Sequence, residues 1–215
     1  MANNPLDRVT TLTFDIFGTV LDLEGSLVGP IDQFLSGRET ALDARGLWVE
    51  WRARQRLEQF QDSLMMLGHS GYLETCRRAL MHVLRKNGVE HDDAEVEGLM
   101  NEFSQLRPFE DAVEGLGRLK HRYRLVALSN GDSELLESLV AERIGVDFDD
   151  VISVDEVGVF KPHPAVYRMA ARTLKVEPPE LMMVAAHAFD ILGARACGYR
   201  AAYVDRYRLP TEESH

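Results

Sequence analysis

The apolar positions of this chain follow two different periods. Residues 9–14 alternate apolar side chains with β-branched threonines and end at Asp15, which is typical of a buried strand. Gly18 then supplies a turn. From Pro108 onward, short apolar runs alternate with amphipathic stretches, and this alternation predicts a parallel sheet with helices on both faces. The expected strands of this part are 124–129, 151–154, 181–185 and 201–204, and the expected helices are 110–121, 133–143, 164–174 and 190–198.

Residues 23–107 have a different pattern from the parts on either side. Residues 23–37 are rich in glycine and contain Pro30, which predicts a linker that turns away from the sheet. Beyond it, apolar residues recur at helical spacing over three stretches, 38–67, 73–86 and 92–107. The sequence therefore predicts a Rossmann-like, doubly wound α/β core formed by residues 1–22 and 108–215, with a helical cap subdomain inserted at 23–107.

Composition narrows the function classes. The 215-residue chain has a formal net charge of −11, which argues against general nucleic-acid binding, because that needs a basic face. Its two cysteines, Cys76 and Cys197, make no disulfide framework and suggest a reducing compartment. No apolar run approaches the roughly 20 residues that span a bilayer, and the N-terminus has no apolar signal region. We therefore expect a cytoplasmic protein that binds neither membranes nor nucleic acids.

Polar residues follow four successive strands or strand-like segments of the predicted core. Asp15 follows the first, Ser129 and Asn130 follow the second, and Lys161 and Asp190 come after the third and fourth. The carboxyl ends of parallel strands open onto one crevice, so these side chains are expected to converge on a small ligand. The alternative interpretation is that each residue only caps the helix or turn that follows it.

These segments resemble the four motifs of the haloacid dehalogenase superfamily, in order FDIFGTV, LSNG, KPHPAVY and MMVAAHAFDILGARACGY. Phosphatases of that superfamily usually carry a second Asp two residues after the nucleophile, as the acid for the leaving alkoxide. This chain has Phe17 there, and an aromatic ring transfers no proton. A halide leaves as a stable anion and needs no acid. The resemblance therefore implies a 2-haloacid dehalogenase that converts haloacetate or L-2-halopropionate to the 2-hydroxy acid.

The resemblance also implies roles for the core residues. Asp15 would attack C2 of the substrate, expel halide and form an ester intermediate. Lys161 would keep Asp15 ionised. Ser129 and Thr19 would hydrogen-bond Asp15 or the substrate carboxylate, and Tyr167 would orient Lys161 or the substrate. The alternative for Tyr167 is a half-buried aromatic residue with no such role.

A second match lies in the predicted cap, where Trp51-Arg52 resembles the helix on which these dehalogenases carry an active-site arginine. Arg52, Asn130 and Phe189 would then form the halide cradle, by combining a cation, an amide N–H and a positive aromatic edge. Arg54 and Arg56 are expected to stay on a solvated helix face.

The fourth motif departs from the better-known dehalogenases, which have Ser and Asn where this chain has Ala185 and His187. His187 would replace them in holding the water that cleaves the ester; the alternative is a structural histidine bonded to backbone. Asp190 would position Lys161 or that water. The substrate would be a monoanion, so Lys161 alone would supply the positive charge, and no metal or other cofactor is expected.

Two other functions remain open from the sequence. One is a Mg²⁺-dependent phosphatase or phosphonatase that uses Asp15 and Asp190, and the other is a catalytically silent binding protein of the same fold. Members of the superfamily are often dimers, so the resemblance also suggests a homodimer. Tyr72, Leu57 and Phe60 are the candidates to line the space for the substrate.

Overall fold

A five-stranded parallel sheet forms the centre of the computed structural model, which describes residues 5–66 and 68–208. Its strand order is β5-β4-β1-β6-β7, so the chain builds outward from β1 in both directions. The strands are β1 (Thr11–Phe14), β4 (Arg124–Ser129), β5 (Asp150–Ser153), β6 (Leu181–Ala185) and β7 (Arg200–Tyr203). The predicted α/β fold with a doubly wound parallel sheet is confirmed.

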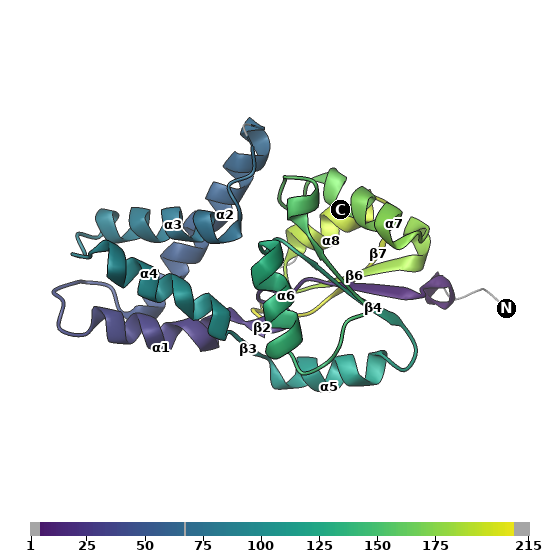
Figure 1. The fold of residues 1–215 in the computed structure, drawn as a ribbon, viewed down its shortest axis with the longest axis horizontal. Coiled ribbons are helices and arrows are strands. Elements are labelled where there is room, and N and C mark those ends of the chain that lie inside the picture. The colour runs from purple at the N-terminus through teal and green to yellow at the C-terminus, as the bar shows by residue number, and fades with distance from the viewer. Residues whose placement is uncertain (1–4, 67, 209–215) are drawn as a thin grey trace.

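Helices cover this sheet as the alternating pattern predicted. They are α5 (Glu110–Leu119), α6 (Ser133–Glu142), α7 (Pro164–Leu174) and α8 (Ala188–Ala196). Short 3-10 helices lie at Pro5–Arg8, Val154–Glu156 and Pro178–Glu180. In the view of Figure 1, α5 lies below the sheet and α7 and α8 lie above it. The helix α7 begins with Pro164 in its first turn, where the missing proline N–H has no intrahelical partner to lose.

Four helices lie to one side of the sheet (Figure 1). They are α1 (Leu23–Leu35), α2 (Ala44–Met65), α3 (Tyr72–Lys86) and α4 (Asp93–Asn101), and a 3-10 turn at Glu102–Gln105 follows α4. Two antiparallel segments, β2 (Leu21–Asp22) and β3 (Arg107–Pro108), join these helices to the rest. None of the helices in the described ranges is long and apolar enough to cross a membrane.

The prediction of a linker over residues 23–37 is wrong, because α1 occupies most of that segment. Leu23, Leu27 and Ile31 recur four residues apart and are buried, so packing outweighs the poor helix propensity of the glycines and of Pro30. The Asp22 carboxylate caps the helix by accepting from the N–H of Gly25 at 2.9 Å.

The apolar face predicted for the long helix α2 is confirmed. Trp48, Trp51 and Gln55 are all buried along it. The indole N–H of Trp51 donates to the carbonyl oxygen of Cys76 at 2.8 Å, which ties α2 to α3. Cys76 is a buried free thiol, and its pKa is raised by burial.

Candidate active site

The residues that follow the strands meet around one buried ammonium group. Lys161 is 1% exposed, and its Nζ donates to Asp15 Oδ1 at 2.9 Å, to Asp190 Oδ2 at 2.6 Å and to the carbonyl oxygen of Leu128 at 2.9 Å. Burial lowers the pKa of Lys161, but the attraction of the two carboxylates outweighs burial and raises it. One fixed cation therefore contacts two buried acids.

Asp15 lies directly after β1, and its carboxylate is held in the ionised form. Burial alone would raise its pKa, but Lys161, His187 and Thr19 together lower it below the ordinary value. Thr19 Oγ1 donates to Asp15 Oδ2 at 2.7 Å, and His187 Nδ1 lies 3.1 Å from the same oxygen. Thr19 also accepts from the backbone N–H of Ala186 at 2.9 Å, so both sides of its hydroxyl are occupied.

Tyr167 acts on the ammonium through Asp190 in this structure. Its hydroxyl donates to Asp190 Oδ1 at 2.7 Å, and the other oxygen of that carboxylate accepts from Lys161, a contact compatible with the expected role of orienting Lys161. Tyr167 is fully buried, which corrects the alternative of a half-buried ring. Gly193 leaves room for the Tyr167 hydroxyl, because a Cβ at residue 193 would lie 2.7 Å from the tyrosine oxygen. Burial raises the pKa of Asp190, against the attraction of Lys161.

Ser129 and Asn130 differ in what they face. Ser129 is fully buried, and its Oγ accepts from the N–H of Gly131 at 3.2 Å. Of the two partners that the resemblance implied for Ser129, Asp15 or the substrate carboxylate, Asp15 is not among its hydrogen-bond partners in the described residues, and the role toward the substrate stays a prediction. Asn130 Oδ1 accepts from the backbone N–H of Lys161 at 2.8 Å, so it fixes the segment that carries the ammonium.

A small enclosed space of about 20 Å³ lies next to Asp15. Residues from both the sheet side and the helices α2 and α3 line it, namely Asp15, Phe17, Arg52, Arg56, Gln59, Tyr72, Asn130, His187 and Phe189. Phe17 stacks on Tyr72 with ring centroids 4.5 Å apart. Gly131 lets the Phe17 ring come this close to the turn, because a Cβ there would lie 2.4 Å from a ring carbon.

Of the three residues proposed to line the substrate space, Tyr72 does so. Phe60 is not among the lining residues but packs edge-on against Phe189, which is, with ring centroids 6.0 Å apart. Leu57 is 44% exposed on the outer face of α2 and does not line this space, which corrects its candidacy.

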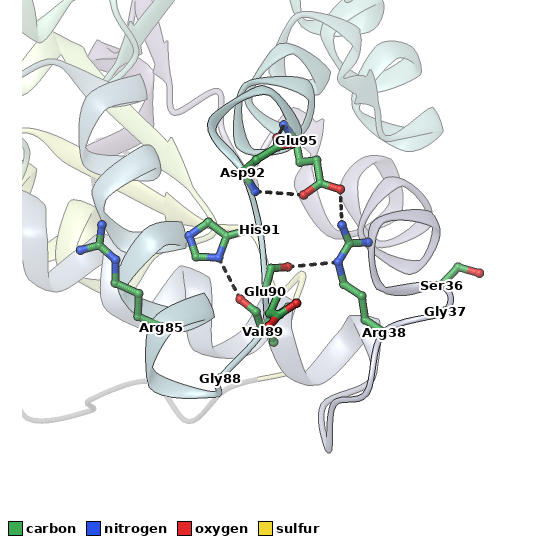
Figure 2. Close-up of a pocket in the computed structure, with 10 residues that line it drawn as sticks. All are labelled: Ser36, Gly37, Arg38, Arg85, Gly88, Val89, Glu90, His91, Asp92 and Glu95. Atoms are coloured by element: carbon green, nitrogen blue, oxygen red, sulfur yellow. Dashed lines mark hydrogen bonds and ion pairs between the residues drawn. The ribbon is translucent and has the colours of Figure 1, made fainter.

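A wider hollow of about 820 Å³ lies elsewhere, between the ends of α1 and α3 and the start of α4 (Figure 2). Several of its polar groups bond one another. Arg38 bonds the carboxylate of Glu95 and donates to the carbonyl oxygen of Glu90 at 3.2 Å, and His91 Nδ1 lies 2.8 Å from the carbonyl oxygen of Val89. None of the acids that line this hollow is buried, whereas Asp15 is, so we take the smaller space at Asp15 as the candidate site.

The family model of haloacid dehalogenase-like hydrolases matches residues 9–198. The chain belongs to this family. The hydrolase is similar to (S)-2-haloacid dehalogenase 4A of Burkholderia cepacia, with 30% identity over 96% of this chain and 87% of that protein. It is also similar to the (S)-2-haloacid dehalogenase of Xanthobacter autotrophicus, with 32% identity over 92% of this chain and 76% of that protein.

A solved structure of the L-2-haloacid dehalogenase from Xanthobacter autotrophicus, with chloropropionic acid covalently bound, superposes on this hydrolase with a TM-score of 0.83. The two are 30% identical, and the match covers 95% of this chain and 80% of that one. The predicted resemblance is therefore confirmed at the level of family and fold.

One residue of this hydrolase that the sequence prediction placed in solvent lines the candidate site. Arg56 lies on the cavity wall beside Arg52, which corrects its assignment to a solvated face. Arg54 pairs with Glu58 on α2, as expected of a surface arginine. A signal for this was present in the sequence, because residues 52, 56 and 59 are spaced i, i+4, i+7 and share one helix face.

Proposed function

We propose that this hydrolase removes halide from short 2-haloacids and releases the 2-hydroxy acid. The observation that carries the proposal is the ionised Asp15 beside Lys161, with Phe17 where a phosphatase would need its proton donor. The names of the similar proteins support the same reaction class. The space is small, about 20 Å³, so it has to widen to admit any 2-haloacid, and it favours short acids over longer ones.

The first step is a displacement at C2. A carboxylate oxygen of Asp15 forms a bond to C2, the carbon–halogen bond breaks, and the halide leaves with the bonding electron pair. Attack from the side opposite the halide inverts C2, so the L-2-halo acid gives the D-2-hydroxy acid. Arg52, Asn130 and Phe189 line the space and would receive the departing halide.

The second step hydrolyses the ester. Water adds to the Cγ of Asp15, the bond between that carbon and the ester oxygen breaks, and the carboxylate is restored as the hydroxy acid and a proton are released. His187 Nδ1, 3.1 Å from Asp15 Oδ2, is the group we assign to hold this water. Lys161 and Asp190 stay paired beside the reacting carboxyl throughout.

We also propose that residues 23–107 act as a cap over a core formed by 1–22 and 108–215. In this structure the carboxylate of Asp132 accepts from the N–H groups of Tyr72 at 2.6 Å and Leu73 at 2.8 Å, which ties the first turn of α3 to the sheet side. Closure of residues 23–107 over the core would exclude bulk water from the ester intermediate and leave the single water that hydrolyses it.

The test is halide release from chloroacetate and L-2-chloropropionate in the presence of excess EDTA. Dehalogenation predicts halide release that EDTA leaves unchanged, and loss of release in Asp15→Asn. A Mg²⁺-dependent phosphatase predicts phosphate release from small phosphoesters and intact carbon–halogen bonds. A silent binding protein predicts that Asp15→Asn keeps its ligand affinity and that the native chain releases no halide.

Two further expectations from the sequence stay predictions. A homodimer is checked by light scattering after size-exclusion chromatography, and a cytoplasmic location by cell fractionation.

A further inference from the structure

Arg56 is a second guanidinium at the candidate site, and the roles carried over from the family do not use it. It lines the same space as Arg52 and Asp15. Its Nε is buried and has no hydrogen-bond partner within residues 5–66 and 68–208. Burial, and then the like charge of Arg52, lower the pKa of Arg56. Because burial and the nearby charge of Arg52 both disfavour the charged guanidinium, we expect it to pair with an anion when the site is occupied.

The substrate carboxylate is the anion that still needs a partner. The resemblance assigned it to Ser129 or Thr19, but neither residue lines the space at Asp15. Ser129 accepts from the turn at Gly131, and Thr19 donates to Asp15 while it accepts from Ala186. The proton of Thr19 is therefore already used, and Ser129, whose Oγ accepts from Gly131 and keeps its own proton, does not line the space at Asp15.

The two arginines differ in what already holds them. Arg52 bonds the side-chain oxygen of Gln55, lies 3.5 Å from the hydroxyl of Tyr72, and has its guanidinium carbon 5.6 Å from the centre of a Trp48 ring. The Nε–H of Arg56 is buried and has no partner in the described residues. An Nε–H beside an Nη–H is the fork that pairs with both oxygens of a carboxylate.

The charges in the site fit one arginine for each of two anions, the substrate carboxylate and the released halide. Before reaction, Lys161 balances one of the two acids, Asp15 and Asp190, so this group carries one net negative charge. Two guanidiniums and one substrate carboxylate bring the total to zero. In the ester state Asp15 is neutral and the halide carries its charge, so two anions, carboxylate and halide, stand opposite two arginines.

We propose that Arg56 binds the carboxylate of the 2-haloacid while Arg52 receives the halide. Arg56 is thus a specificity-determining residue that selects acids over neutral haloalkanes and haloamides. This assignment rests on the proposed dehalogenation, and it places the carboxylate next to α2 rather than in the turn after β4.

The test measures binding without turnover, in an Asp15→Asn background, by NMR titration with chloroacetate, chloroacetamide and bromide. Arg56→Met is expected to weaken chloroacetate binding at least tenfold and to change bromide and chloroacetamide binding less than twofold. Arg52→Met is expected to weaken bromide binding more than Arg56→Met does. The matched control is Arg54→Met, two residues away on α2 and paired with Glu58, which is expected to stay within twofold for every ligand.

Thermal unfolding of each variant shows whether it is folded, and Arg56→Lys serves if Arg56→Met is not. The lysine keeps the charge but loses the fork, so an intermediate loss for chloroacetate is expected. The proposal is overturned if Arg56→Met leaves chloroacetate binding within twofold, if it weakens all three ligands equally, or if the Asp15→Asn parent binds no chloroacetate.

Failure of this inference can be told from failure of the proposed function. Halide release by the native chain, together with unchanged chloroacetate affinity in Arg56→Met, sinks only the role of Arg56. Chloroacetate binding that depends on Arg56, without halide release by the native chain, sinks the reaction and leaves a carboxylate site.

Discussion

Replacing Lys161 with Met tests the central arrangement of the candidate site. The Lys161 ammonium donates to both Asp15 and Asp190, and the variant removes that charge. Methionine keeps much of the volume of the lysine stem and carries no charge. We therefore expect the variant to keep the packing nearly intact, so that the change in unfolding free energy reports the loss of the charge.

The distances give the size of the effect. At an effective dielectric constant near 20, ion pairs at 2.9 and 2.6 Å are each worth about 6 kcal/mol before desolvation is subtracted. Desolvation removes several kcal/mol for each ion. Breaking a buried pair by deleting one partner is expected to lower the free energy of unfolding by about 3–5 kcal/mol.

The pH dependence gives the sign. In the native chain the pKa of Asp15 lies below its ordinary value of 3.8, so the stability it contributes is present above that pH and is lost on acidification. Without Lys161, burial dominates and raises the pKa of both carboxyls above their unfolded values. The folded variant then binds more protons than its unfolded chain, so its stability falls as pH rises. The gap from the native chain should widen by up to about 1.4 kcal/mol per pH unit for each such proton.

The assay is urea unfolding at several pH values between 5 and 8, with halide release measured alongside. Lys161→Met with Asp190→Asn is the control, because removing the second acid is expected to restore part of the lost stability but not the activity. The reasoning is refuted if Lys161→Met unfolds within 1 kcal/mol of the native chain, shows the same pH dependence and still releases halide.

Three further changes probe the rest of the site. Gly131→Ala puts a methyl group 2.4 Å from the Phe17 ring, so we expect a loss of about 1–3 kcal/mol in unfolding free energy and a slower reaction; unchanged melting would contradict this. Asp132→Ala removes the carboxylate that caps α3, so we expect the free energy of unfolding to fall by about 0.5–2 kcal/mol and KM to rise. An unchanged KM would show that this contact plays no part in closing the site. His187→Ala is expected to slow ester hydrolysis and to accumulate an Asp15 ester visible by mass spectrometry of the intact protein, and normal turnover without ester would remove His187 from the second step.

The sequence predicted the core elements well where strong local signals coincided. Residues 124–129 and 181–185 are apolar runs bounded by turns, and the structure has strands with those bounds. The helix at 164–174 also has the predicted bounds, because Pro164 marks its start. The helix expected at 190–198 begins two residues earlier, at Ala188, since no capping residue marks its start.

The misses have one physical cause, which is that tertiary packing overrides local preference. Gly25 and Pro30 predict a break, but the buried face of α1 holds the helix together. Likewise, the charge of Arg56 predicts solvent, but its position on α2 turns it toward Asp15. A local pattern shows which residues share a helix face, whereas it does not show what that face covers.

Phe17 shows how one substitution in a motif affects chemistry and architecture together. At the position where phosphatases of the superfamily usually carry their acid, this chain has a ring that stacks on Tyr72 of α3 at 4.5 Å and packs over the turn at Gly131. The ring is 4% exposed and lines the space next to Asp15, so a buried apolar group stands where a phosphatase would carry its proton donor. The absence of the acid and the contact with α3 beside Asp15 therefore come from the same side chain, which favours a leaving group that departs without a proton.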